Sequence, residues 1–167
     1  MFRFDFDKSV QAVGVLLGYE RARRMNYMRL LKLLYLADRE YLLKTGHTIT
    51  GDHAVALKRG PVLSQVYDLI RGLSSRAGDW GRLIRTERYE VELVAETGRG
   101  ELSKGEVQTL LEVSERYRDL DEWSLSDATH EWQLAIPRLR PADRRLLQIG
   151  VRRNAGPKSR WVDEWRP

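Results

Sequence analysis

Apolar residues recur at helical spacing in the first third of the chain and predict two helices. The first is expected to begin near Lys8, with Ser9 as its N-cap. The second is expected to run from Met25 to Thr45 and to end at Gly46, which suits a left-handed C-cap. Because the second helix is apolar around most of its circumference, it is predicted to be central and covered by its neighbours.

Short alternating segments further along the chain predict strands. Residues 53–58 alternate with period 2 and are expected to stop at Arg59-Gly60-Pro61. Pro61 suits the first turn of a following helix, since its missing N–H has no partner there. The buried face of that helix is predicted to be Val62, Val66, Leu69, Ile70 and Leu73. After a loop over 74–81, the segments 83–86 and 89–94 predict a hairpin.

A capping box, Ser103-Lys104-Gly105-Glu106, opens a helix in the second half of the chain. A shorter helix is expected from Ser124 or Ser126 to about Trp132, and another over 141–149. The predicted fold class is therefore α+β and predominantly helical: a central long helix surrounded by helices, with a small sheet of about three short antiparallel strands.

Composition narrows the class of protein. A length of 167 residues suits one domain, and the absence of cysteine excludes disulfides and thiolate metal sites. No apolar run approaches the ~20 residues of a membrane span, and the first residues, MFRFDFDKSVQ, do not resemble a signal peptide. We therefore expect a cytoplasmic protein without membrane contact.

The positive charge of the chain is concentrated at its C-terminal end. Residues 1–136 hold 20 basic and 21 acidic residues, a net of −1, whereas residues 137–167 hold 9 basic and 3 acidic residues, a net of +6. Clustered positive charge can bind phosphates or an acidic protein surface. The candidate contacts are Arg144, Arg145, Arg152 and Arg153.

Motifs for catalysis are missing from the sequence. His47, Asp52 and His53 are metal-ligand types in one short segment, but no HxH or HExxH motif accompanies them. There is no GxSxG elbow, and Gly98-Arg99-Gly100 is too short for a phosphate loop. We therefore predict no catalytic residue, no metal and no cofactor, and a protein that is not an enzyme.

Nucleic-acid binding is an alternative, because winged-helix domains also combine helices with a small hairpin. The helix expected after Pro61 offers only a mixed set of exposed polar residues for a recognition helix: Gln65, Asp68 and Arg71. The predicted hairpin adds three arginines and three glutamates: Arg82, Arg85, Arg88, Glu87, Glu90 and Glu92. The C-terminal arginines could bind DNA phosphates without sequence preference. Together with a winged-helix topology, they favour the alternative of a nucleic-acid-binding repressor that regulates its own operon.

Six short motifs are spread over residues 31–132. They are LKLLYLAD at 31–38, ITGD at 49–52, Ala-x-x-x-GPV at 56–62, Val66-Tyr67, the SKGE capping box and LSDATHEW at 125–132. Together they resemble the Panacea domain family, formerly a domain of unknown function, which includes SocA-like antitoxins and phage-associated GepA-like proteins. Glu131 alone separates His130 from Trp132 here, a shortened version of the family's later Thr-His-x-x-x-Trp-like ending.

The resemblance implies an antitoxin that neutralises a cognate toxin, usually encoded by an adjacent gene, through protein–protein contact. One branch of the family resembles a proteolytic adaptor that delivers its toxin to an ATP-dependent protease, which is a further alternative. The family has no recognised catalytic residues. We assign 1–136 to a Panacea domain and 137–167 to a C-terminal helix and basic tail that pack on it or extend from it.

Most motif residues are interpreted as core, and those expected to be exposed are the candidates for partner binding. The cognate toxin is the expected partner, with DNA as a secondary one. The partner-binding candidates are Lys58, Arg59, Gln65, Tyr67 and Asp68.

Overall fold

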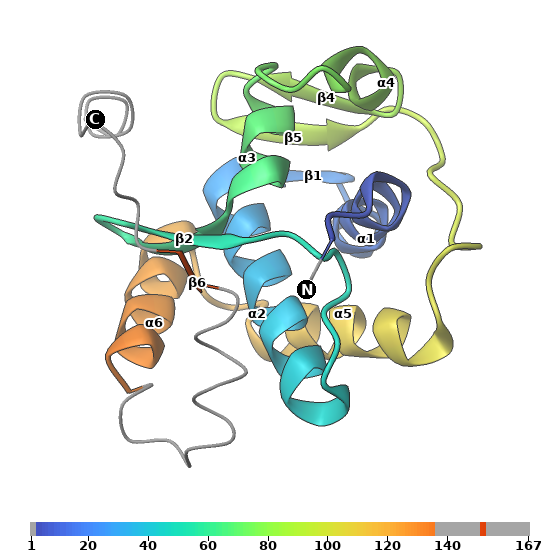
Figure 1. The fold of residues 1–167 in the computed structure, drawn as a ribbon. Coiled ribbons are helices and arrows are strands. Elements are labelled where there is room, and N and C mark those ends of the chain that lie inside the picture. Colours follow the sequence, from blue (N-terminus) through green and yellow to red (C-terminus); the bar gives the residue numbers. More distant parts are fainter. Residues whose placement is uncertain (1–2, 136–150, 153–167) are drawn as a thin grey trace.

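The structure, a computed structural model, describes residues 3–135 and 151–152. These residues form a mainly helical α+β fold (Figure 1), which confirms the predicted fold class. The elements in chain order are α1 (Phe6–Tyr19), β1 (Arg24–Asn26), α2 (Tyr27–Thr45), β2 (Ala54–Leu57), β3 (Gly60–Leu63), α3 (Ser64–Ile70), α4 (Ala77–Gly81), β4 (Ile84–Glu87), β5 (Glu90–Leu93), α5 (Lys104–Arg116), α6 (Glu122–Ala135) and β6 (Val151–Arg152).

Helix α2 is the axis of the fold, as its apolar circumference predicted. It packs against α1, α5, α6 and β3 and runs through the middle of the molecule in Figure 1. The Asn26 side chain accepts a hydrogen bond from the Met28 N–H at 2.8 Å and starts the helix. Gly46 ends it with a φ of 81°, the left-handed C-cap that was predicted.

The strands form two small sheets instead of one. The first sheet has the antiparallel order β1-β5-β4, and the second has the order β3-β2-β6, in which β6 runs parallel to β2. The described residues thus contain six strands, where the sequence predicted about three. Strand β1 is the clearest omission, because its three residues are too few to show alternation and it is defined by a distant partner, Met25 opposite Val91.

The predicted break at Arg59-Gly60-Pro61 is wrong in part. Only Lys58 and Arg59 form a turn, and Gly60–Leu63 pairs with β2 as strand β3, with Pro61 opposite Ala56. Pro61 is tolerated because β3 is an edge strand of its sheet, where a missing N–H breaks no inner ladder. The following helix therefore begins at Ser64, three residues later than Pro61 would start it.

Other local signals were misread near helix ends. Asp5, and not Ser9, caps α1 by accepting a hydrogen bond from the Lys8 N–H at 3.0 Å. The buried Ser9 hydroxyl instead donates to the Asp5 carbonyl at 2.6 Å. Leu73 was expected to be buried but is 55% exposed. The segment expected to be a loop over 74–81 contains α4.

Three later predictions are confirmed. β4 and β5 form the expected hairpin, and Ser103 and Glu106 form the reciprocal capping box of α5. The helix expected at Ser124 or Ser126 is α6, which begins slightly earlier because Asp121 accepts a hydrogen bond from the Ser124 N–H at 2.7 Å. The helix predicted over 141–149 lies outside the described residues.

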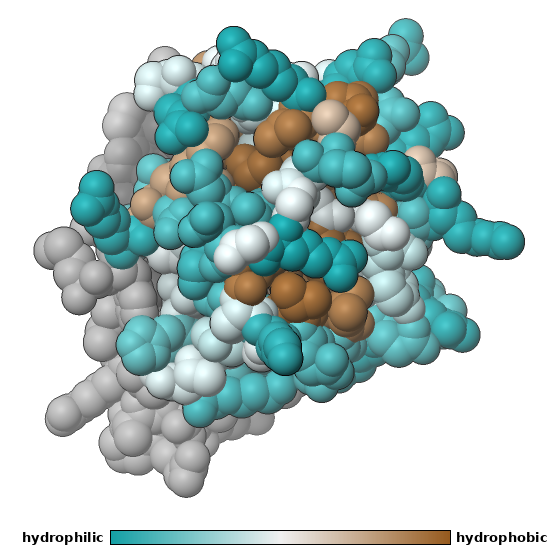
Figure 2. Space-filling view, turned by 90° about the vertical axis from the view of Figure 1, so that its right-hand side faces the viewer, coloured by the Kyte–Doolittle hydropathy of each residue, from teal (hydrophilic) through white to brown (hydrophobic). Residues whose placement is uncertain are grey.

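The face that carries the segment between β5 and α5 is mainly hydrophilic. Figure 2 shows apolar side chains on this face as separate areas among polar ones.

Replacing Gly14 is predicted to test the packing of α1 against the segment after β5. A Cβ at Gly14 would lie 1.9 Å from Thr97 Oγ1, whereas a Cβ at Gly18 on the same helix would meet nothing within 4 Å. We expect Gly14→Ala to lower the free energy of unfolding by about 1–3 kcal/mol, the usual cost of overpacking. Gly18→Ala is the matched control and should be neutral or stabilising by up to about 1 kcal/mol. Urea unfolding of both variants measures the difference, and equal stabilities would contradict this packing.

Candidate partner-binding site

The turn between β2 and β3 is held from inside the molecule by Lys32. This side chain of α2 is only 1% exposed, and its ammonium donates to the Arg59 and Pro61 carbonyls at 2.8 Å each. Burial lowers the pKa of Lys32 to about 7. The backbone carbonyls are the polar partners of this buried amine, so the turn has a fixed position on the central helix.

Helix α6 holds the same turn from the other side. The Ser126 hydroxyl donates to the Arg59 carbonyl at 2.6 Å. Gly60 has a φ of 92°, and a Cβ there would lie 3.1 Å from the Lys32 amine and 3.2 Å from Thr129 Oγ1. A side chain at Gly60 would therefore be both strained and crowded. The segment GPV thus packs against the Thr129 region of the later motif.

Asp38 fixes the chain just after α2. Its buried carboxylate accepts from the Ile49 N–H at 2.9 Å, from the Thr50 N–H at 3.0 Å and from the Thr50 hydroxyl. Burial raises the pKa of Asp38 to about 7, against the lowering effect of the hydrogen bonds from Thr50 and Ile49. Asp38 therefore has a structural role in the ITGD turn.

Asp52 supplies the cap of α3 from a distance. The residue at the N-cap position, Leu63, has no capping side chain, and the Asp52 carboxylate accepts instead from the Gln65 and Val66 N–H groups, each at 2.9 Å. It also accepts from the His53 N–H at 2.6 Å. Burial raises the pKa of Asp52, and these backbone hydrogen bonds oppose the shift.

The motif segments 31–38, 49–52 and 56–62 therefore meet in one network around α2. This shared geometry fits a common scaffold, and the comparison with protein families agrees with it. The chain matches the family described as "Antitoxin SocA-like, Panacea domain" over residues 30–133, which is more than half of its 167 residues. The chain belongs to this family. No match was found among curated proteins or among solved structures.

The Panacea domain exposes only some of the residues predicted for partner binding. Lys58 and Arg59 are exposed at the β2–β3 turn, and Gln65 and Asp68 are half-buried on α3. Tyr67 was expected to be exposed, but it is only 2% exposed. Its ring packs between elements of the core, where it stacks on Tyr27 with centroids 6.3 Å apart. Tyr67 therefore belongs to the scaffold.

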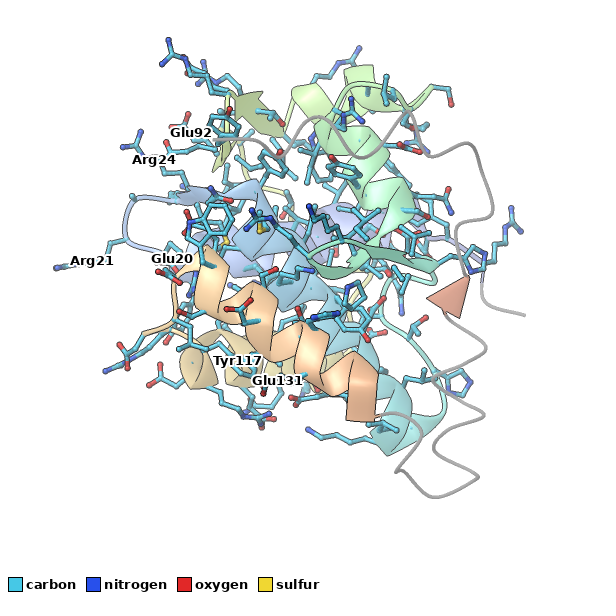
Figure 3. The ribbon with its side chains drawn as sticks, turned by 90° about the vertical axis from the view of Figure 1, so that its left-hand side faces the viewer. Glu20, Arg21, Arg24, Glu92, Tyr117 and Glu131 are labelled. Carbon is cyan, nitrogen blue, oxygen red and sulfur yellow. The ribbon has the colours of Figure 1, made fainter. Side chains whose placement is uncertain are left out.

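The structure adds Trp123, which the sequence did not single out. Trp123 is 44% exposed at the start of α6, and the Arg59 guanidinium carbon lies 4.2 Å from its ring centroid, a cation–π contact. Figure 3 shows α6 in front, with the β2–β3 hairpin beside it. We call Lys58, Arg59 and Trp123 the hairpin surface. Sequence spacing could not reveal it, because 64 positions separate residues that meet only in the fold.

The basic residues predicted to bind phosphates or an acidic partner lie almost wholly beyond the described chain. Arg144, Arg145 and Arg153 are outside the described residues. Arg152 lies in β6, where the backbone alone is described, opposite Val55. Their role stays a prediction.

Two of the three residues considered as metal ligands, His47 and Asp52, lie close to other polar groups, whereas the buried His53 Nδ1 has no hydrogen-bond partner among the described residues. The His47 ring lies 3.1 Å from the Thr45 carbonyl, and Asp52 caps α3. In the part of the chain that the structure describes, no three acidic or histidine side chains are grouped to hold a metal ion. Within the same residues, no helix combines the length and apolar composition of a membrane span.

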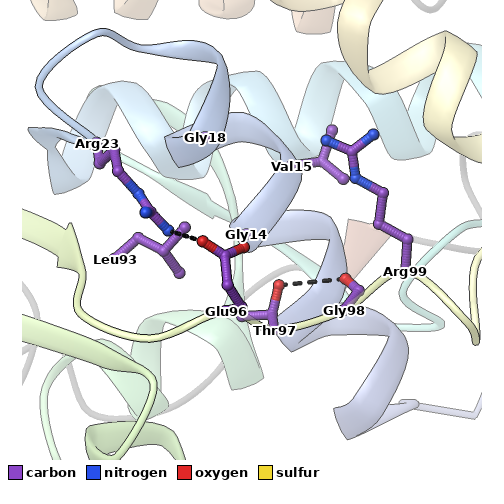
Figure 4. Close-up of a pocket in the computed structure, with 9 residues that line it drawn as sticks. All are labelled: Gly14, Val15, Gly18, Arg23, Leu93, Glu96, Thr97, Gly98 and Arg99. Carbon is purple, nitrogen blue, oxygen red and sulfur yellow. Dashed lines mark hydrogen bonds and ion pairs between the residues drawn. The ribbon is translucent and has the colours of Figure 1, made fainter.

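A cavity of about 390 Å³ lies between α1 and the segment after β5 (Figure 4). Arg23 and Glu96 form an ion pair across it at 2.5 Å, and Arg99 borders it. The Thr97 hydroxyl donates to the Gly98 carbonyl at 3.3 Å. The Gln11 side chain of α1 accepts a hydrogen bond from the Glu101 N–H at 2.9 Å, which holds the segment against the helix. We therefore interpret this cavity as part of the packing rather than as a site.

Removing the remote cap of α3 is predicted to destabilise the domain. Asp52→Ala leaves buried N–H groups without an acceptor and should lower the free energy of unfolding by about 3 kcal/mol. Asp121→Ala removes an exposed cap of α6 and is the matched control, for which a clearly smaller loss is expected. Denaturant unfolding followed by circular dichroism compares the two. Equal losses would show that Asp52 has no special role.

The buried Lys32 amine is predicted to make stability depend on pH above neutrality. Its pKa is about 7 in the folded protein and 10.5 ordinarily, so between these values the unfolded chain binds more protons. The stability of the wild type should therefore rise with pH relative to Lys32→Met, by at most about 1.4 kcal/mol per pH unit. Lys44→Met, at an exposed lysine, controls for the loss of one positive charge. The test is the free energy of unfolding of each protein, measured between pH 7 and pH 10. If the free energies of wild type and Lys32→Met change with pH in parallel, the lowered pKa of Lys32 is contradicted.

Proposed function

We propose that this chain is a non-enzymatic antitoxin that neutralises a cognate toxin, encoded by an adjacent gene, by direct protein–protein binding. The observation that carries the proposal is its membership of the SocA-like antitoxin family across residues 30–133. The buried groups Lys32, Asp38 and Asp52 fit this proposal, because each binds backbone groups and thereby has a structural role.

The hairpin surface is the contact that we propose for the toxin. Arginine and tryptophan are the residues most enriched at interface hot spots. Here Arg59 is presented by a turn that Lys32 and Ser126 already hold in place, and Trp123 is presented by α6, so binding costs little ordering of this backbone. Gln65 and Asp68, both half-buried on α3, complete the proposed contact residues.

The nucleic-acid alternative receives less support from the described residues. α3 has only seven residues, and the three candidates for a recognition helix, Gln65, Asp68 and Arg71, are all half-buried. Of the hairpin arginines, Arg82 lies 3.8 Å from an Asp79 oxygen and Arg85 lies 3.5 Å from a Glu92 oxygen. Paired arginines are less available to phosphates.

Co-expression with the neighbouring gene tests the proposal. We expect the neighbour alone to arrest growth and the wild-type protein to restore it. Arg59→Glu and Trp123→Ser should each weaken toxin binding at least tenfold, about 1.4 kcal/mol, and reduce the rescue. Arg21→Glu is the matched charge control, because Arg21 projects away from the body of the protein in Figure 3.

Calorimetry with purified proteins measures the affinities, and circular dichroism checks that each variant folds. A neighbour that is not toxic, or toxicity that this protein does not relieve, would contradict the antitoxin function. Rescue that depends on an ATP-dependent protease, with a shortened toxin half-life, would favour the adaptor alternative. Equal affinities for Arg59→Glu and Arg21→Glu would exclude the hairpin surface.

A further inference from the structure

A second exposed feature lies at the turn of the β4–β5 hairpin. The segment that packs on α1 follows the opposite end of this hairpin. It is a groove of about 540 Å³ between the end of α3 and the β4–β5 turn. We call it the tyrosine–arginine groove. It is lined by Tyr27, Ile70, Arg71, Gly72, Thr86, Arg88 and Tyr89.

An aromatic stack anchors one wall of the tyrosine–arginine groove. Tyr89 is 59% exposed, and its ring stacks on Tyr27 with centroids 6.4 Å apart and an interplanar angle of 18°. Tyr27 stacks in turn on the buried Tyr67. The Tyr89 carbonyl also accepts from the Tyr27 N–H at 2.9 Å. The exposed ring is therefore held on a support that reaches the core, as a preorganised anchor should be.

Two arginines provide the charge of the groove. The Arg71 guanidinium carbon lies 5.5 Å from the Tyr67 ring centroid, which orients it at the end of α3. Arg88 is exposed and, among the described side chains, takes part in no ion pair. No carboxylate is found among the described residues that line the groove. The groove is thus aromatic and positively charged.

The backbone at Arg88 is in the left-handed region. Its φ is 52°, at the first position of a two-residue hairpin loop, where glycine is favoured. The turn imposes this strain, and strained residues of this kind concentrate at functional sites. The arginine at this position is exposed and lines the same groove as Tyr89.

We propose that the tyrosine–arginine groove binds an acidic segment of the toxin, with a carboxylate on Arg88 and a neighbouring side chain against Tyr89. This rests on the proposed antitoxin function and adds a second contact, separate in residues from the hairpin surface. Arginine pairs with carboxylates through parallel hydrogen bonds, and tyrosine and arginine are common interface anchors.

The charges around the loop favour a peptide over a nucleic acid. Glu87 and Glu90 flank Arg88 and Tyr89 on both sides, and both glutamates are exposed. A polyphosphate chain carries a charge at every nucleotide and would meet these carboxylates. A peptide can place a carboxylate on Arg88 and avoid the glutamates. The groove therefore suits an acidic segment of a protein better than a nucleic acid.

The first experiment measures the affinity of the toxin for groove variants by calorimetry at two salt concentrations. Arg88→Glu and Tyr89→Ser should weaken binding at least tenfold, and Arg88→Glu should also reduce its salt dependence. Arg99→Glu is the matched control, since Arg99 is exposed beyond the other end of β5 and borders the other cavity (Figure 4). Wild-type rescue with unchanged affinity for Arg88→Glu and Tyr89→Ser would overturn the groove and leave the antitoxin function standing.

Arg88→Gly separates binding from folding. Glycine adopts a positive φ without strain, so this variant should unfold at a higher urea concentration than the wild type and still bind the toxin more weakly. A purely structural Arg88 would show loss of stability and no loss of affinity. That result would overturn the proposal.

A second probe keeps the proposal testable if the neighbouring gene product does not bind. A decapeptide of alternating glutamate and glycine is titrated into the labelled protein and followed by amide chemical shifts. We expect saturable shifts confined to the groove and absent with a lysine–glycine peptide, at residues Arg71, Gly72, Thr86, Arg88 and Tyr89. Absence of these shifts, or shifts produced only by a ten-nucleotide oligothymidine, would overturn an acidic protein partner.

Discussion

A buried amine on the central helix is the constraint on which the architecture of this domain depends. An ammonium group loses most of its hydration when it enters the core, and it must recover polar contacts there. Lys32 finds them in the Arg59 and Pro61 carbonyls rather than in a carboxylate. The hydrogen bonds to these two carbonyls fix the position of the β2–β3 turn. They thereby orient the side chains at the turn toward the solvent.

Other charged side chains of α2 also form hydrogen bonds with backbone groups of neighbouring elements. Arg29, 9% exposed, donates to the Tyr117 and Leu120 carbonyls beyond the end of α5, and Asp38 accepts from backbone amides of the ITGD turn. Charged side chains of α2 thus satisfy backbone groups where other elements end, in the way that caps satisfy the ends of helices. Apolar packing alone would hold these elements less specifically, because the hydrophobic effect has no direction.

Local signals in the sequence were sufficient where the partners are close in the chain. The Ser103–Glu106 capping box and the Gly46 cap involve residues within one turn of helix, and both were predicted. Strand β3 and the cap of α3 were missed, because Pro61 is tolerated only through its edge position and Asp52 acts on a helix that begins twelve residues later.

The candidate sites show the same limit. Lys58 and Arg59 were identified as exposed, but no spacing in the sequence joins them to Trp123 or combines Arg71 with Tyr89. Tyr67 was misplaced because its neighbours on α3 look amphipathic, whereas its ring fills the space beneath Tyr27. Burial of an aromatic residue on a short helix depends on what packs over it, which spacing does not encode.

The remote cap of α3 has a consequence for how the domain opens. A helix of seven residues is too short to persist alone in water. Its first N–H groups are satisfied by Asp52, whose position depends on the turn that Asp38 holds against α2. The stability of α3 is therefore coupled to that of the ITGD turn, because the cap of the helix depends on the turn. A local fluctuation that frees the ITGD turn would expose Tyr67 and remove the support of the Tyr27 and Tyr89 rings in the same event.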